Sequence, residues 1–151
     1  MALRLRTEMP ELKGVTEWVN GEVTKEELLG KPVLIHFWSI SCGICKKSMP
    51  DVLKIRDGYK DAGLQVVGIH MPRSEKDTDK EAVKEAIEKY EMTHPQAIDN
   101  QHSVVDAFEN EFVPAFYLFD AEGQLRHRSA GEKAMKMLER PLERLLGNQE
   151  Q

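Results

Sequence analysis

Residues 37–50 read Phe37-Trp-Ser-Ile-Ser-Cys42-Gly-Ile-Cys45-Lys-Lys-Ser-Met-Pro50, and they join two kinds of sequence pattern. Before them, residues 32–38 form a mostly apolar run, which is typical of a strand covered on both faces. After them, residues 43–61 place apolar side chains on or near one helical face, and residues 64–69 form a second apolar run. This order predicts a right-handed parallel strand–helix–strand unit.

Both cysteines of the chain fall at the junction between the first strand and the helix. Cys42 is expected at the helix N-terminus, where free N–H groups and the positive end of the helix dipole favour a thiolate. The spacing of three lets both sulfurs share the first helical turn, close enough for a disulfide. Such a bridge closes a very short loop and stabilises the fold little, so the pair indicates redox chemistry. We expect Cys42 to be the exposed nucleophile and Cys45 to attack the resulting mixed disulfide.

The remaining patterns predict one α/β domain over residues 1–151, with a central mixed sheet flanked by helices. Asn20-Gly21 predicts a small N-terminal β-hairpin over residues 17–23. Further elements are predicted from caps, periodicity and turn signals. They are a short helix from the Thr24/Glu27 capping box to Gly30, helices over 79–91, 103–109 and 132–146 (with a kink at Pro141), and hairpin strands over 115–119 and 124–128.

Composition excludes several classes of function. The net charge is −5, and no block of like charge suggests a nucleic-acid tail or a membrane patch. The beginning of the chain lacks the roughly 7–15 apolar residues of a secretory signal. No run approaches the ~18 apolar residues that span a bilayer. We therefore expect a cytoplasmic protein that binds neither nucleic acid nor membrane.

The stretch from Phe37 to Pro50 resembles the active-site segment of the thioredoxin superfamily. Glu111-Phe-Val-Pro-Ala-Phe116 resembles the family's segment that carries a cis-proline opposite the disulfide. About forty residues separate the second strand from this proline. This helical insertion and the N-terminal hairpin resemble the TlpA/ResA-like branch, in particular its short leaderless bacterial thiol–disulfide oxidoreductases. The resemblance extends from about Met9 to Leu146.

This resemblance implies a thioredoxin-like fold and reversible thiol–disulfide exchange on Cys42 and Cys45. It implies a cis Val113–Pro114 bond that forms one wall of the substrate site, with Trp38 shaping that site. The implied partners are disulfide-containing protein substrates, with reduction the favoured direction in the cytosol, and an upstream thiol reductant. No organic cofactor is implied beyond the redox-active disulfide, and we expect a monomer.

The chain departs from the thioredoxin pattern at three places. Gly43-Ile44 stands where thioredoxin has Gly-Pro, so a redox potential cannot be transferred. Ser41 replaces a second tryptophan. His36, six residues before Cys42, replaces a buried aspartate that assists proton transfer, and is a candidate for that role. Glu75 is the nearest candidate for a glutamate that the TlpA/ResA-like branch associates with the site.

Two other functions stay open on the cysteine pair. A peroxiredoxin-like peroxidase would need a proline where Ile35 stands, although Ser39 fits its pattern. A copper chaperone of the same superfamily would use one more residue between the cysteines. The other histidines show no ligand-like spacing, so no metal site is predicted; they are His70, His94, His102 and His127.

Overall fold

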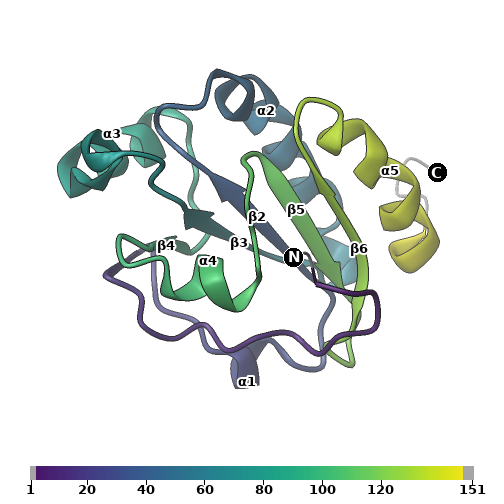
Figure 1. The fold of residues 1–151 in the computed structure, drawn as a ribbon. Helices are drawn as coiled ribbons and strands as arrows, with labels where there is room; N and C mark the ends of the chain where they lie inside the picture. The colour runs from purple at the N-terminus through teal and green to yellow at the C-terminus, as the bar shows by residue number, and fades with distance from the viewer. Residues whose placement is uncertain (1–2, 148–151) are drawn as a thin grey trace.

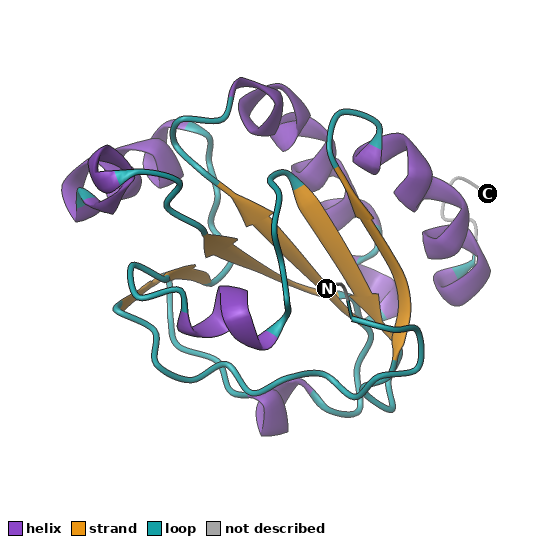
Figure 2. Ribbon diagram, in the orientation of Figure 1, coloured by secondary structure: helices purple, strands orange, loops and turns teal. Residues whose placement is uncertain are grey.

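The computed structural model describes residues 3–147 and contains one six-stranded sheet, with strand order β1-β4-β3-β2-β5-β6 (Figures 1 and 2). The strands are β1 (Glu17–Val19), β2 (Val33–Trp38), β3 (Gln65–His70), β4 (Gln96–Ile98), β5 (Ala115–Phe119) and β6 (Leu125–Ala130). The α-helices are α1 (Lys25–Leu28), α2 (Gly43–Gly58), α3 (Lys80–Lys89), α4 (Ser103–Ala107) and α5 (Ala134–Leu146), and two 3₁₀ helices are η1 (Lys60–Ala62) and η2 (Glu75–Thr78).

The sheet is mixed, as the sequence predicts. Strands β2, β3 and β4 run parallel, whereas β1, β5 and β6 each lie antiparallel to a neighbour. Strand β2, helix α2 and strand β3 follow one another along the chain, and β2 pairs with β3 from Val33↔Gln65 to Trp38↔His70. The predicted parallel strand–helix–strand unit is therefore confirmed, and it carries the cysteines at the carboxyl end of β2.

Alternate residues of the buried strands feed two cores, one on each face of the sheet. One core lies under the N-terminal segment, α1 and α4; in Figure 1 this segment and α4 lie in front of the sheet. The other core lies under α2, α3 and α5, with α2 behind the sheet in Figure 1. Leu34 and Trp38 point into the second core, which also holds both cysteines. The redox pair is thus part of a packed layer.

The predicted N-terminal hairpin over residues 17–23 is wrong. Asn20 and Gly21 do adopt positive φ angles of 68° and 108°, as a tight turn requires. Strand β1 nevertheless pairs with β4, from Glu17↔Ile98 to Val19↔Gln96, and residues 21–23 form no strand. Asn20-Gly21 therefore forms a turn as predicted, but β1 pairs with β4, which is distant in sequence, and not with residues 21–23.

The other predicted elements are present with small shifts in their ends. The capping box of Thr24 and Glu27 is formed at α1. The helix predicted over residues 43–61 is divided into α2 and η1, and Pro141 lies inside α5. Strand β4 and helix η2 had not been predicted. Within residues 3–147, no helix is both long and apolar enough to cross a membrane.

Candidate active site

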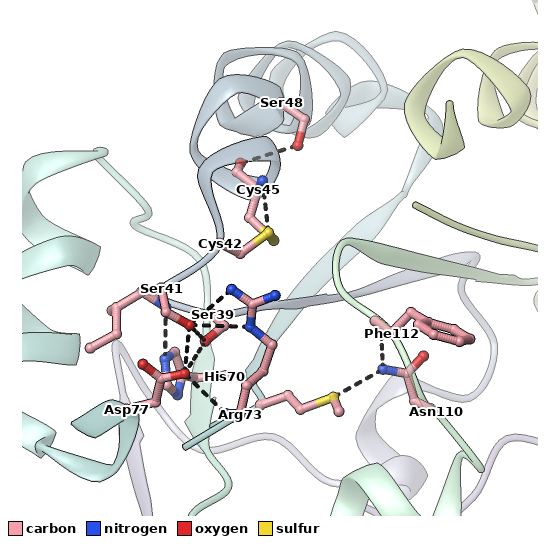
Figure 3. The surroundings of a disulfide bond; sticks show 12 residues. Ser39, Ser41, Cys42, Cys45, Ser48, His70, Arg73, Asp77, Asn110 and Phe112 are labelled. Atoms are coloured by element: carbon pink, nitrogen blue, oxygen red, sulfur yellow. Dashed lines mark hydrogen bonds between the residues drawn. A yellow bond between two sulfur atoms is a disulfide. The ribbon is translucent and has the colours of Figure 1, made fainter. Parts of the chain in front are cut away.

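Cys42 and Cys45 form a disulfide at the start of α2 (Figure 3). Cys42 is the N-cap residue of this helix, in extended conformation, and Cys45 lies in its first turn. The two Cα atoms are 5.3 Å apart, within the usual range for a disulfide. The Cys45 backbone N–H donates to Cys42 Sγ at 3.1 Å. The helix end therefore presents a backbone donor to the first sulfur, the arrangement that stabilises a thiolate there.

The disulfide is almost completely buried. Cys42 is 4% exposed and Cys45 1% exposed, so the expectation of an exposed Cys42 is wrong for this oxidised form. The physical reason is packing, because both cysteines belong to the core between the sheet and α2. Cys42 remains the slightly more exposed of the two.

The Val113–Pro114 bond is cis, as the resemblance implied. Pro114 immediately precedes β5, whose first residue Ala115 pairs with Phe37 of β2. The cis bond is thus level with the end of β2 that leads to Cys42. Val113 is half-buried and packs against both cores. The carbonyl of Phe112 accepts a hydrogen bond from Asn110 Nδ2 at 2.9 Å, while the Phe112 side chain is 62% exposed.

Trp38 is buried in the same core as the cysteines. Its ring meets the His70 ring edge to face, with the centroids 4.8 Å apart. Its Nε1–H donates to Gln96 Oε1 at 2.9 Å. Trp38 therefore forms part of the floor of the site and is not a surface platform in this form.

His36 belongs to a buried polar network that continues from Trp38. Gln96 turns its oxygen to Trp38, so its Nε2 faces His94 Nε2 at 2.8 Å as a donor. His36 Nε2 lies 2.8 Å from the same His94 atom. His94 Nε2 therefore carries no proton and accepts from Gln96 with its single lone pair, and the His36 ring lies in contact with the same atom. The pair is neutral: burial, followed by the charge of the other ring, holds the pKa of His36 well below its usual value.

The sheet register explains how this network fits into the core. His36, Gly68 and Gln96 are level with one another on β2, β3 and β4. A Cβ atom on Gly68 would collide with the Gln96 amide. Glycine at this position therefore leaves room for the Gln96 amide and its contacts with Trp38 and His94, and a glycine inside an apolar strand is the signal that could have indicated them.

The carboxylate that is hydrogen-bonded to the segment before Cys42 belongs to Asp77, not to Glu75. Glu75 is exposed at the start of η2. Asp77 is buried, and its Oδ2 accepts from Ser39 Oγ and Ser41 Oγ, both at 2.7 Å, and from the Arg73 backbone N–H at 2.9 Å (Figure 3). Burial raises the pKa of Asp77, but these three hydrogen bonds outweigh it and the pKa lies below its usual value. Asp77 is therefore an ionised group that reaches the redox pair through Ser41, the residue before Cys42.

His70 and His94, whose spacing in the sequence indicates no ligand role, also lie in this region. His70 Nε2 accepts from the Ile40 backbone N–H at 3.1 Å, and burial lowers the pKa of His70 to about 4 although Asp77 acts in the opposite direction. His94 has its pKa lowered to about 4, first by burial and then by Arg56. Both rings are therefore uncharged at neutral pH, and both help to hold the site in place.

Comparisons with known proteins agree with this geometry. The family model described as the AhpC/TSA family matches residues 5–128. The thiol-disulfide oxidoreductase YkuV of Bacillus subtilis is 54% identical over 149 residues, covering 98% of this chain and 100% of the relative. The thiol-disulfide oxidoreductase ResA of Bacillus cereus is 26% identical over 131 residues, covering 87% of this chain and 73% of the relative.

A solved structure has a similar fold. The solution structure of a thioredoxin-like protein in the oxidised form superposes with a TM-score of 0.87 at 54% identity, covering 95% of this chain and 97% of that one. The sequence match, the shared fold and the disulfide at the helix N-terminus lead to one conclusion. The chain belongs to the AhpC/TSA family, and it is a thiol–disulfide oxidoreductase with a thioredoxin-like fold.

Proposed function

We propose that the protein reduces disulfides in other proteins, with Cys42 as the nucleophile and Cys45 as the resolving thiol. The Cys42 thiolate attacks one sulfur of the substrate disulfide, forms a mixed disulfide and releases the first substrate thiolate. The Cys45 thiolate then attacks Cys42 Sγ and releases the second substrate thiolate. Two electrons pass from the dithiol to the substrate, and the Cys42–Cys45 disulfide remains.

The observation that carries this proposal is the position of the two sulfurs on α2. Cys42 caps the helix, and its Sγ accepts a hydrogen bond from the Cys45 N–H. Cys45 lies in the first turn and is the less exposed of the two cysteines. The helix dipole acts most strongly at the N-terminus, so Cys42 is the thiol that it favours as a thiolate. Cys45 is within disulfide reach of Cys42, which is what resolution requires.

We place the substrate along Val113 and Pro114, with Trp38 below them. An extended peptide would pair with the backbone of Val113, because Pro114 has no N–H and its carbonyl already accepts from the Gly131 N–H at 2.9 Å. The exposed Phe112 side chain adds an apolar contact beside the site, and Asn110 holds the Phe112 backbone through the Phe112 carbonyl. His36 is proposed to relay protons for Cys45. A role for Glu75 stays a prediction, and Glu75→Gln with unchanged exchange kinetics would contradict it.

No organic cofactor is needed, because the electrons reside in the two sulfurs, and an upstream thiol reductant restores the dithiol. The net direction follows from the reduction potential measured against glutathione. A value near about −270 mV corresponds to a thioredoxin-like reductant, and a value near about −120 mV to an oxidant. The cytoplasmic location and the monomeric state stay predictions, which cell fractionation and light scattering would test. We also predict a role in electron transport, which identification of the reductant would test.

The cysteine roles predict different behaviour of two serine variants in insulin reduction. Cys42→Ser should reduce insulin no faster than dithiothreitol alone, since the nucleophile is absent. Cys45→Ser should form a mixed disulfide with insulin that persists, because nothing resolves it. Mass spectrometry after acid quenching detects this adduct and its position. A persistent adduct on Cys45 of the Cys42→Ser protein, with none on Cys42 of the Cys45→Ser protein, would reverse the roles.

The same preparation tests the two alternative functions. Consumption of hydrogen peroxide by the wild-type dithiol at a rate comparable to insulin reduction would favour the peroxidase. Tight binding of Cu(I) by the reduced protein, without insulin reduction, would favour the metal chaperone. Among the residues that the structure describes, no three His, Cys, Asp or Glu side chains gather as a metal site would require.

A further inference from the structure

A cluster of polar side chains connects the segment before Cys42 to the segment that follows β3. Its members are Ser39, Ser41, Arg73 and Asp77, which we call the Arg73 cluster. Arg73 Nε and Nη2 donate to Ser41 Oγ at 3.1 and 3.0 Å, and Ser41 is covalently adjacent to Cys42. The guanidinium, from a residue more than thirty positions along the chain, is therefore fixed next to the redox pair (Figure 3).

The donors and acceptors at Ser41 determine which group donates in the Arg73–Ser41 contact. The single hydroxyl proton of Ser41 is donated to Asp77 Oδ2 at 2.7 Å. The lone pairs of Ser41 Oγ are then left for the two Arg73 donors, which can only donate. Asp77 in turn accepts from the Arg73 backbone N–H, so one carboxylate fixes both the hydroxyl and the origin of the arginine side chain. The cluster thus orients Arg73.

The placement of the Arg73 guanidinium and the Asp77 carboxylate around Ser41 favours the thiolate form of Cys42. In Figure 3 the Arg73 guanidinium lies on the cysteine side of Ser41, and the Asp77 carboxylate lies on the opposite side. Asp77 also has its charge compensated by three hydrogen bonds. Of the two charged groups of this cluster, the positive one therefore lies on the side of Cys42. A positive charge close to a thiol favours its ionised form.

We propose that Arg73 is a positioning residue that stabilises the Cys42 thiolate, and that Ser41 and Asp77 hold its guanidinium for this purpose. The proposal rests on the role of Cys42 as nucleophile. In the reduced protein the Cys42 thiol releases its proton to solvent, and the resulting negative charge faces the helix N-terminus and the guanidinium. Arg73 forms no bond with the substrate in this step. Its effect is on the fraction of Cys42 that is ionised.

The test compares the pH dependence of Cys42 alkylation in the reduced wild-type protein and in four variants. Arg73→Gln removes the charge, Arg73→Lys keeps a charge without the planar fork, and Ser41→Ala removes the anchor. Lys76→Gln is the matched control, since it removes one positive charge from an exposed position of the same segment. Iodoacetamide labelling is followed by mass spectrometry, which identifies the modified cysteine at each pH.

We expect Arg73→Gln to slow alkylation of Cys42 about three- to tenfold at pH values below the thiol pKa, and to raise that pKa accordingly. Arg73→Lys should recover part of the loss, and Ser41→Ala should reproduce part of it. The difference between wild type and Arg73→Gln should shrink at 1 M salt, because exposed charges are screened. If the Arg73–Ser41 contact were purely structural, the variants would change the denaturation midpoint but not the pH profile of Cys42 alkylation.

The outcomes separate this proposal from the one it rests on. Labelling of Cys45 before Cys42 in the wild-type protein would contradict the assigned nucleophile. Labelling of Cys42 first, with the same pH profile in Arg73→Gln and Lys76→Gln, would overturn the role of Arg73 alone. Equal profiles of wild type and Arg73→Lys together with a shifted Arg73→Gln would support a simple charge effect. Circular dichroism at each pH confirms that the variants compared are folded.

Discussion

At neutral pH the buried imidazole of His36 is uncharged, because burial and then the neighbouring His94 hold its pKa well below the usual value. It is a poor final proton acceptor for this reason, so the relay proposed for it requires a second group to take the proton onward. Its contact with His94 Nε2 is 2.8 Å, and His94 Nδ1 lies 3.5 Å from Nη1 of Arg56, a partly exposed residue. The two rings lie one after the other between strand β2 and the partly exposed Arg56, and the proton relay proposed for Cys45 would pass through them.

We therefore expect His36→Ala to slow resolution of the mixed disulfide by Cys45 more than formation of the mixed disulfide by Cys42. His36→Gln is the matched variant, because its amide fills the site and can reach His94 but does not shuttle protons. Rapid-quench mass spectrometry measures the two steps separately. Equal slowing of both steps in His36→Ala, with normal kinetics in His36→Gln, would identify a packing role instead.

Single residues differed in how far the sequence could predict them. Cys42, Cys45 and Pro114 were predictable because each is marked by a local pattern. His94 and Gln96 were not, since their contacts with β2 depend on the register of β4, a three-residue strand with little periodicity. Asp77 was missed because several acids stand close together in residues 75–79, and only the fold selects which one turns inward.

At the scale of elements, the apolar runs predicted β2, β3 and β5 well, because a strand buried on both faces leaves a continuous signal. The pairing of strand β1 was harder to predict from the sequence. Its partner β4 is nearly eighty residues away, and the Asn20-Gly21 turn signal favoured a local partner that does not exist. The turn instead serves the loop before β4, where Asn20 Nδ2 donates to the carbonyls of Met92 at 2.6 Å and His94 at 3.1 Å.

This role of Asn20 can be measured with two substitutions. Asn20→Gly keeps the backbone unstrained at φ 68° but loses both hydrogen bonds, each worth about 0.5–1.5 kcal/mol. Asn20→Ala loses the same bonds and adds about 1 kcal/mol of strain, because alanine disfavours a positive φ. Urea denaturation should therefore rank the free energies of unfolding as wild type, then Gly, then Ala. A glycine variant as stable as wild type would remove the hydrogen bonds from this account.

At the scale of the whole molecule, buried neutral histidines make the free energy of unfolding depend on pH. His70 and His94 have folded-state pKa values of about 4, and His36 is lowered as well. In the unfolded chain these groups titrate near about 6.5. Below that pH the unfolded state binds more protons than the folded state, so stability falls as pH decreases from about 6.5 toward 4.

The expected loss at pH 5 is about 2 kcal/mol for each of His70 and His94, relative to pH 7.5. Urea denaturation at a series of pH values measures it. His94→Gln should flatten the curve between pH 6.5 and 5 by removing one titrating group. Asp77, whose pKa is lowered, contributes in the same direction only at more acidic pH. A free energy of unfolding that stays constant from pH 7.5 to 5 would contradict the buried, neutral state of these rings.

The burial of both sulfurs decides how quickly the oxidised protein exchanges electrons with its surroundings. An attacking thiolate must reach a disulfide sulfur directly, and here only a few per cent of either cysteine is accessible. A freely diffusing thiol has to wait for a local opening of the chain, whereas a bound partner can use its binding energy to cause one. The oxidised molecule is therefore insulated from the glutathione pool on short timescales. The oxidised fraction of this protein in a cell would therefore depend more on exchange with specific protein partners than on the current ratio of small thiols to disulfides.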